Sequence, residues 1–172
     1  MVSAMPKYRY KSVLDITVED LHKMGAKAVA LDIDNTICND GKQNCISGLE
    51  NWLEEVQKSG IKVMILSNAM PRRPKNVAGR LGVPYICMAR KPKPHKLIKA
   101  AQMMNVKIHE LAMVGDQLFA DVMAANDCGA IAIRVEPLEG ETRFKKFYER
   151  RRAKEAPVIE EFEKLHGFGY YD

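Results

Sequence analysis

The chain has 172 residues, 47% of them hydrophobic and 28% charged, a composition that fits one compact domain with a hydrophobic core and excludes wholesale disorder. It contains no stretch approaching the roughly 20 apolar residues that cross a bilayer and no apolar run of the secretory kind near its start, so a cytoplasmic location is expected. The formal net charge of +5 favours anionic partners, namely phosphate esters, nucleic acid or an acidic membrane surface, although an ordinary solvated basic surface gives the same charge.

Short apolar runs alternate with amphipathic segments along most of the chain. Near the start, Thr17 with Asp20 three residues later predicts a capped short helix over Thr17–Met24. The apolar runs predict five strands, at Lys27–Asp32, Lys62–Leu66, Val83–Met88, Glu110–Val114 and Ala130–Val135. Helical spacing and terminating glycines predict the helices between them, at Ile46–Ser59, Lys75–Leu81, Pro94–Asn105 and Leu118–Asp127. Strands that alternate with helices predict an α/β fold with a mostly parallel five-stranded sheet covered on both faces.

The segment after the last strand differs in character. Thr142–Lys164 is long and charged, which predicts a helix with a break at Pro157. Its basic part, Arg143–Lys154, also carries aromatic residues. This pattern fits a helix that lies on a membrane surface, and it equally fits a solvated helix whose aromatic rings pack on the core. We therefore expect a single domain over residues 1–172, with a core at about 25–136 and a basic helical extension at about 141–166.

Two carboxylates, Asp32 and Asp34, follow the first predicted strand of the sheet. Ligands of open α/β sheets bind at the carboxyl ends of the strands. Because two like charges are costly to bury without a compensating cation, Mg²⁺, which prefers oxygen ligands, is the natural partner. The same carboxylates, followed by Asn35 and Thr36, also fit an ordinary turn.

Polar residues follow three further strands. Ser67 and Asn68 end one of them, and Gly115 with Asp116 ends another, where glycine permits a tight turn and Asp121 lies about one helical turn further on. The basic run from Arg90 to Lys96 precedes a helix, whose N-terminus also favours anions. Each motif alone fits a helix cap, a turn or a solvated loop. Together they converge on one edge of the sheet and make a site for a metal and a phosphate.

The series resembles the four motifs of the haloacid dehalogenase (HAD) superfamily, namely Asp32-Ile33-Asp34-Asn35-Thr36, Ser67-Asn68, Lys91-Pro92 and Gly115-Asp116 through Asp121. Further segments are similar to the YqeG-type subclass IIIA phosphatases: Tyr10–Thr17, Ala89–Pro92, Gly115–Leu118 and Thr142–Phe144. One departure is Ala120, where members of the family commonly carry threonine. The resemblance implies a three-layer Rossmann-like HAD fold, and the short segments between the motifs leave no room for a cap domain.

The resemblance also implies a role for each catalytic residue. Asp32 attacks the phosphorus and forms an aspartyl-phosphate. Asp34 protonates the leaving oxygen and then activates the water that hydrolyses this intermediate. Ser67 holds a phosphoryl oxygen, and Lys91 neutralises the phosphoaspartate; the motif register favours Lys91 over Lys93 for this role.

The implied cofactor is Mg²⁺, held by the carboxylates of Asp32 and Asp116 and by the backbone carbonyl of Asp34, with Asp121 in support. Three neighbouring polar side chains are implied to contact the substrate, and these are Asn68, Arg90 and Lys93. The physics agrees with this scheme, because phosphoryl transfer depends on positioning and charge neutralisation.

The sequence leaves the class of phosphorylated substrate open. A site without a cap suits a bulky substrate. Some eukaryotic relatives are phosphatidylglycerophosphate phosphatases, so a lipid phosphate with peripheral membrane contact is one expectation; a phosphosugar, a nucleotide or a phosphoprotein is another. A different class of function is a HAD-fold module that binds RNA or protein without turnover. The intact acidic, hydroxyl and lysine positions argue against such a module and against a nucleic-acid partner.

Overall fold

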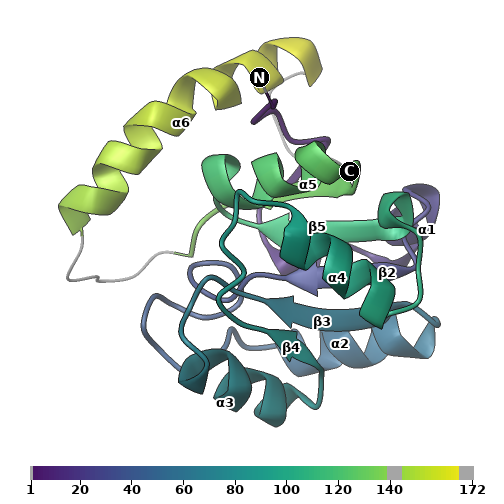
Figure 1. Cartoon of the computed structure of the whole chain (residues 1–172). Helices are drawn as coiled ribbons and strands as arrows, with labels where there is room; N and C mark the ends of the chain where they lie inside the picture. The colour runs from purple at the N-terminus through teal and green to yellow at the C-terminus, as the bar shows by residue number, and fades with distance from the viewer. Residues whose placement is uncertain (1, 139–144, 167–172) are drawn as a thin grey trace.

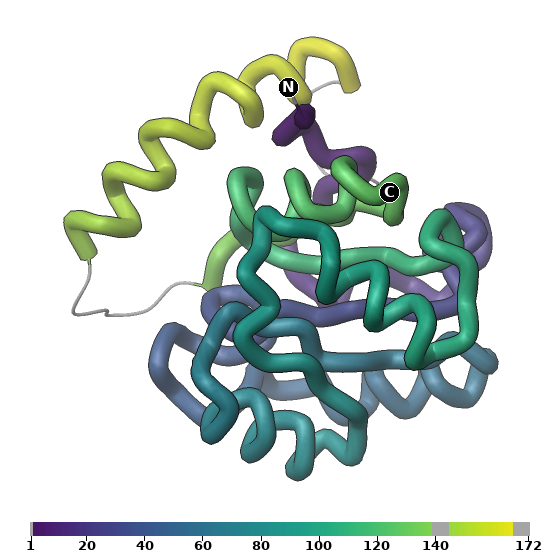
Figure 2. Tube along the Cα trace, in the orientation of Figure 1, coloured from purple at the N-terminus to yellow at the C-terminus, as the bar shows by residue number. Residues whose placement is uncertain are grey.

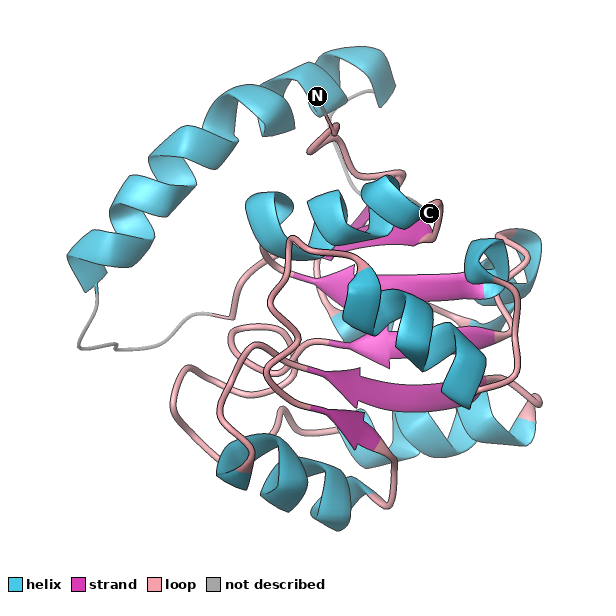
Figure 3. Cartoon of the chain, viewed as in Figure 1, coloured by secondary structure: helices cyan, strands magenta, loops and turns pink. Residues whose placement is uncertain are grey.

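The computed structural model describes residues 2–138 and 145–166, and a six-stranded sheet lies at its centre (Figure 1, Figure 3). The strands are β1 (Tyr8–Tyr10), β2 (Ala28–Leu31), β3 (Lys62–Leu66), β4 (Tyr85–Ile86), β5 (Leu111–Gly115) and β6 (Ile131–Val135). Their order is β1-β6-β5-β2-β3-β4, and every neighbouring pair is parallel. The predicted α/β fold is confirmed, whereas the predicted number of five strands is one too few.

The strand that the sequence did not predict is β1, at one edge of the sheet, where Tyr8 pairs with Ile133. It consists of only three residues and has the charged Arg9 at its centre, so no apolar run marks it. The Arg9 guanidinium is held by ion pairs to Glu136 and Glu163, at 2.8 and 2.6 Å. Pairing with β6 and these ion pairs, rather than an apolar run in the sequence, therefore define this strand.

The helices lie between successive strands, except for the last one, which follows β6. They are η1 (Val13–Asp15), α1 (Val18–Lys23), α2 (Leu49–Lys58), α3 (Arg72–Leu81), α4 (His95–Met103), η2 (Ile108–Glu110), η3 (Leu118–Val122), α5 (Met123–Cys128) and α6 (Lys145–His166). The predicted cap of α1 is confirmed: the Thr17 hydroxyl accepts from Asp20 N, and the Asp20 carboxylate accepts from Thr17 N, at 3.0 and 3.3 Å. The predicted helix at Leu118–Asp127 begins instead with a π-helical turn, η3, before α5.

The sheet is covered on both faces, as the sequence predicts (Figure 2). Successive residues of a strand point to opposite faces, so alternate residues of β2 contribute to different cores. Val29 and Leu31 pack with residues of α1, α2 and α3. Ala28 and Ala30 pack with residues of α4, η3 and α5. All four positions are fully buried, which explains why β2 reads as a continuous apolar run.

The C-terminal helix α6 continues through Pro157, so the predicted break there is wrong. Pro157 leaves the carbonyl of Ala153 without a helical partner, but Ala153 is exposed and water can satisfy it. Thr142, Arg143 and Phe144, which belong to the predicted basic helix and to the family resemblance, lie outside the described residues. No helix in residues 2–138 and 145–166 is long and apolar enough to span a bilayer.

A charge network joins β1, β6 and α6 around Glu136. The Glu136 carboxylate pairs with Arg9 at 2.8 Å and with the Arg134 guanidinium, whose side chain is 1% exposed. Although burial alone raises the pKa of Glu136, the charges of Arg134 and Arg9 outweigh this effect and hold the pKa below its ordinary value. The ionised form of Glu136 therefore stabilises the folded state.

Glu136→Gln is expected to lower the free energy of unfolding at pH 7 by about 2 kcal/mol, because a charged hydrogen bond is lost beside a buried guanidinium. The folded-state pKa is depressed, so the contribution is fully present above the ordinary Glu pKa of about 4.3 and is lost as pH falls through the lower folded-state value. Urea unfolding of the two proteins from pH 7 to pH 3 measures the difference. A difference that does not shrink at low pH would contradict the prediction.

Candidate active site

Four sequence-predicted residues meet at the carboxyl edge of the sheet. Asp32 directly follows β2, Asp116 follows β5, and Asp121 lies in η3. Because β2 and β5 are neighbours in the sheet, their ends bring these carboxylates together. One oxygen from each of the three lies within 4.8 Å of the others, and the three residues are at most 5% exposed. The fourth residue, Lys91, reaches the same cluster from the loop after β4.

Lys91 makes the central ion pairs of this cluster. Its ammonium lies 2.8 Å from Asp32 Oδ1 and 2.6 Å from Asp121 Oδ1, and it donates to the carbonyl of Leu66 at 3.0 Å. The side chain of Lys91 is 2% exposed, whereas Lys93 is exposed. Of these two lysines, Lys91 is therefore the one that contacts Asp32.

Asn68 holds the loop that carries Lys91. Its side-chain oxygen accepts from Lys91 N at 2.8 Å, and its side-chain nitrogen donates to Lys91 O at 3.2 Å. The peptide bond between Lys91 and Pro92 is cis. The amide of Asn68 thus contacts the backbone of the lysine loop with both of its polar atoms.

Burial dominates the electrostatics of the cluster. It raises the pKa of Asp32 to about 8, with added repulsion from Asp121 and Asp116 and opposition from Lys91. It likewise raises the pKa of Asp116 to about 6. For Lys91, burial disfavours the ammonium, but the charges of Asp121 and Asp32 prevail and raise its pKa. Buried carboxylates that repel one another thus favour further positive charge in this site.

These residues fit a divalent cation. Asp32, Asp116 and Asp121 offer oxygen ligands close enough to surround one ion, and hard divalent cations prefer such ligands. Lys91, together with the Arg152 guanidinium that pairs with Asp116 at 2.9 Å, still leaves the three carboxylates with excess negative charge, which a divalent ion would offset. The donor chemistry and the charge both support the predicted metal site.

Asp34 lies apart from the carboxylate cluster. Its Oδ1 pairs with Arg73 Nη1 at 2.6 Å and accepts from Gly41 N at 3.3 Å, and its side chain is 26% exposed. Arg73, at the start of α3, also donates to the carbonyl of Asn39 at 3.2 Å. The side chain of Asp34 is therefore anchored to the loop after β2 and to α3, at the partly exposed rim of the site.

Gly115 is required for space rather than for a tight turn. Its φ lies outside the left-handed region that glycine alone adopts freely, so the dihedral reason expected from the sequence is wrong. A Cβ at this position would lie 2.1 Å from Asp121 Oδ2. The same oxygen accepts from Gln117 N at 3.1 Å, which fixes the carboxylate over the glycine. The π-helical turn η3 thus places Asp121 directly against the end of β5.

Ser67 follows β3 and is 1% exposed. Its hydroxyl oxygen accepts from Ala69 N at 3.1 Å, which leaves the hydroxyl proton available for donation. Arg90 and Lys93 are exposed and line a surface pocket of about 570 Å³ beside the Lys91 loop. The side chains that line this pocket come from Cys87, Met88, Ala89, Arg90, Lys93, His95 and Lys96. Arg90 and Lys93 therefore lie outside the carboxylate cluster.

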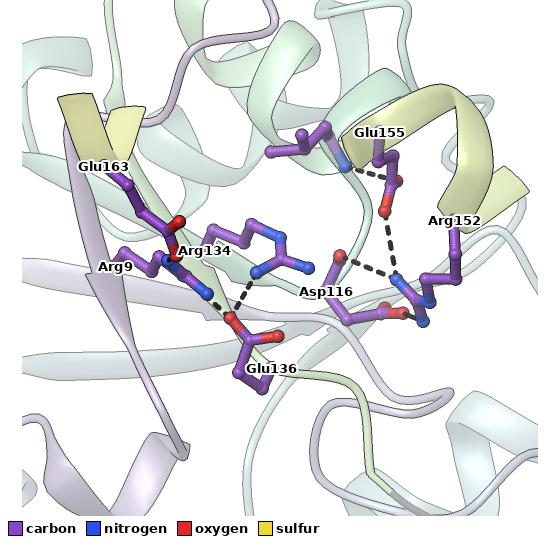
Figure 4. Close-up of polar contacts among 8 residues, drawn as sticks. Arg9, Asp116, Arg134, Glu136, Arg152, Glu155 and Glu163 are labelled. Carbon is purple, nitrogen blue, oxygen red and sulfur yellow. Dashed lines mark hydrogen bonds and ion pairs between the residues drawn. The ribbon is translucent and has the colours of Figure 1, made fainter. Parts of the chain in front are cut away.

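Two residues of α6 that the sequence did not single out also reach the cluster (Figure 4). Arg152 Nη2 donates to Asp116 Oδ2 at 2.9 Å, and the fully buried Glu155 accepts from Leu118 N at 2.9 Å. Arg152 is the last of three consecutive arginines in a charged segment, so nothing local distinguishes it from its neighbours. Arg73, the partner of Asp34, was also missed; it too stands beside another arginine, Arg72.

Comparison with known proteins agrees with this geometry. A model of the haloacid dehalogenase-like hydrolase family matches residues 41–129. The probable phosphatase YqeG of Bacillus subtilis (strain 168) is 36% identical over 151 residues, which cover 86% of this chain and 88% of that protein.

Two solved structures share the fold. An uncharacterized protein from Listeria monocytogenes serotype 4b has a TM-score of 0.55 and 19% identity, covering 68% of this chain and 84% of that one. The cobalt-bound deoxy-D-mannose-octulosonate 8-phosphate phosphatase of Haemophilus influenzae has a TM-score of 0.50 and 16% identity, covering 78% and 92%. With the family match, the YqeG relative and the buried carboxylates together, the chain belongs to the haloacid dehalogenase-like hydrolases and is a metal-dependent phosphatase of the YqeG type.

Proposed function

We propose that this enzyme hydrolyses phosphomonoesters with Mg²⁺ as its cofactor and Asp32 as its nucleophile. The observation that carries the proposal is the contact of the buried Asp32 carboxylate with Lys91, beside the carboxylates of Asp116 and Asp121. A carboxylate nucleophile divides the hydrolysis into two easier steps. Bound Mg²⁺ would be held by Asp32, Asp116 and the Asp34 carbonyl, with Asp121 in support, and would offset the charge of the phosphoryl oxygens.

In the first step, an Asp32 oxygen forms a bond to phosphorus while the bond from phosphorus to the ester oxygen breaks. The departing oxygen takes a proton from the Asp34 carboxyl, and Lys91 offsets the negative charge of the phosphoaspartate. The Ser67 hydroxyl donates a hydrogen bond to a phosphoryl oxygen. In the second step, Asp34 takes a proton from water, the water oxygen bonds to phosphorus, and phosphate leaves as the Asp32 carboxylate is restored.

The position of Asp34 adds a requirement to this scheme. Its carboxylate is paired with Arg73 at 2.6 Å in the structure. To protonate the leaving oxygen, the Asp34 side chain must exchange this contact for one with the substrate. Arg73 is then close enough to the same region to bind an anionic part of the substrate.

We further propose that the substrate is bulky. Between Asn35 and Ser67 the chain holds one loop, α2 and β3, and between Ser67 and Lys91 it holds α3 and β4, so neither segment has room for a folded cap. The pocket beside the lysine loop contains Arg90 and Lys93, which suit an anionic part of the substrate outside the reacting phosphate.

A lipid phosphate is the finer form of this proposal. The first turns of α6 carry Phe147, which is 63% exposed, among the exposed cations Lys145, Lys146 and Arg150. Aromatic and basic side chains together favour contact with an anionic membrane surface. Soluble phosphosugars, nucleotides and phosphoproteins are the competing substrate classes.

Chelation of metal with EDTA is expected to reduce release of phosphate from a generic aryl phosphate to background, and excess Mg²⁺ is expected to restore it. The physical reason is that the carboxylate cluster repels an anionic substrate until a cation offsets its charge. Full activity in metal-free buffer would rule out the metal's role, and no activity with Mg²⁺ would favour a binding module.

Under the same conditions, the kcat/KM for phosphatidylglycerophosphate in anionic vesicles is expected to exceed the values for soluble phosphosugars, nucleotides and phosphopeptides. The reverse order would exclude the lipid as the substrate.

A further inference from the structure

The C-terminal helix α6 contacts the catalytic edge at several points along its length. Near the start of the helix, Tyr148 is hydrogen-bonded to Asp40 in the loop after β2. Burial, together with this hydrogen bond and the charge of Asp40, raises the pKa of Tyr148 to about 12. Arg152 and Glu155 contact the segment that follows β5, and Phe162 is 4% exposed. Figure 4 shows Arg152 reaching from α6 to Asp116, with Glu155 beside Arg152 on the same helix. The helix therefore links the loops that follow β2 and β5.

Arg152 supplies the shortest hydrogen bond to the Asp116 carboxylate among the described residues. Its Nη2 donates to Oδ2 at 2.9 Å, and its Nη1 lies 3.4 Å from the Asp116 carbonyl oxygen. The other carboxylate oxygen, Oδ1, accepts from the Thr36 hydroxyl at the longer distance of 3.3 Å. Without Arg152, this fully buried carboxylate would keep only the weaker restraint and would rotate more freely.

Glu155 completes the attachment of the helix. Its Oε1 accepts from Leu118 N at 2.9 Å, and its Oε2 accepts from Arg152 Nη1 at 3.1 Å. One carboxylate thus fixes both the backbone after Asp116 and the guanidinium that holds the Asp116 side chain. Outer partners of this kind orient metal ligands, and their loss typically weakens metal affinity or activity by about 10–100-fold.

A cation beside a metal ligand has two opposite effects. Its charge repels the metal ion, whereas its hydrogen bond fixes the ligand. Arg152 is paired with the fully buried Glu155, so the two residues together add no net charge to the site. The repulsion between Arg152 and the metal ion is therefore largely cancelled. The orienting hydrogen bond then makes the net effect of Arg152 on metal affinity favourable.

We propose that Arg152 and Glu155 are positioning residues of the metal site, so that the affinity of this phosphatase for its divalent cation depends on the docking of α6. This inference rests on the proposed function, because it assumes that Asp116 is a metal ligand. It adds that a helix outside the four motifs is a functional part of the catalytic centre.

A second anchor maintains the docking. Glu163, about three helical turns beyond Arg152, or roughly 16 Å along the axis, pairs with Arg9 of β1 at 2.6 Å. The Arg9 side chain is 10% exposed and also pairs with Glu136 after β6. The far half of α6 is thus held independently of the metal site, which keeps Arg152 in register with Asp116.

Mn²⁺ binding to the full chain, followed by electron paramagnetic resonance, tests the inference without relying on turnover. Arg152→Ala is expected to raise the Mn²⁺ Kd by about tenfold or more. Arg152→Lys, which keeps the charge but not the forked geometry, is expected to fall between Arg152→Ala and wild type. Lys154→Ala removes one positive charge from an exposed position of α6 and is expected to change the Kd by less than about twofold.

Thermal unfolding in EDTA separates positioning from folding. A purely structural role would lower Tm while leaving the Mn²⁺ Kd of the folded protein unchanged. If Arg152→Ala fails to fold, Glu155→Gln tests the positioning role in its place. The glutamine amide keeps one oxygen as an acceptor but cannot form the ion pair with Arg152. The Mn²⁺ Kd of this variant is also expected to rise.

Asp116→Asn identifies which proposal fails. If wild type binds Mn²⁺, Asp116→Asn does not, and Arg152→Ala matches or exceeds wild type in affinity, the positioning role is overturned while the metal site stands. If wild type itself binds no Mn²⁺, or Asp116→Asn binds as tightly as wild type, the metal assignment fails and the positioning role fails with it.

Discussion

Asp32→Asn is expected to lower kcat by roughly 10⁴-fold or more, because the amide is neither a nucleophile toward phosphorus nor an anionic metal ligand. The side chain keeps nearly the same volume, and one of three crowded carboxylates loses its charge. Lys91 keeps its ion pair with Asp121 at 2.6 Å and its hydrogen bond to the Leu66 carbonyl at 3.0 Å. The fold is therefore expected to survive the change.

Steady-state release of phosphate, compared at saturating substrate, measures this loss, and circular dichroism with thermal unfolding checks the fold. Asp127→Asn makes the same chemical change at an exposed aspartate and is expected to behave like wild type. A kcat for Asp32→Asn within about tenfold of wild type would exclude Asp32 as the nucleophile.

Gly115→Ala is expected to lower kcat/KM by about 100-fold, although it adds only a methyl group. The new Cβ would lie 2.1 Å from Asp121 Oδ2, far inside contact distance, so Asp121 or the end of β5 must move. Movement of Asp121 disturbs its 2.6 Å ion pair with Lys91 and its hydrogen bond from Gln117 N. A displacement of about 1 Å in a catalytic constellation costs on the order of 100-fold.

Gly79→Ala is the matched control for this substitution. Gly79 lies in α3, and a Cβ there would meet nothing within 4 Å. Alanine is the better helix former, so this variant is expected to be as active as wild type and equally or more stable. Wild-type kcat/KM in Gly115→Ala would show that the site does not require Asp121 in its present position.

The site residues that the sequence predicts best are the polar residues that directly follow predicted strands. Asp32, Ser67 and Asp116 each follow an apolar run, and parallel strands bring such positions to one edge. The choice of Lys91 over Lys93 depended on motif register, and the 2.8 Å contact with Asp32 supplies the physical reason. Lys91 is buried and Lys93 is exposed. This difference depends on the tertiary structure and cannot be read from the sequence of a basic run.

Other features could not be predicted because distant partners create them. β1 is a strand because it pairs with β6, and its Arg9 bonds Glu136, which is 127 positions away in the chain. Arg152 reaches Asp116 from a helix whose charged sequence gives no clear inward face. The role of Gly115 depends on where the π-helical turn η3 places Asp121, and no spacing rule distinguishes that turn from an ordinary α-helix.

The pairing of β1 with β6 has a consequence for biosynthesis. Tyr8 pairs with Ile133, and the strands β2, β3, β4 and β5 are all translated between these two residues. Contacts between such distant segments form slowly, because a long loop must close before they are gained. Because β1 has no strand partner until β6 is made, we expect this edge of the sheet to form last when the chain folds.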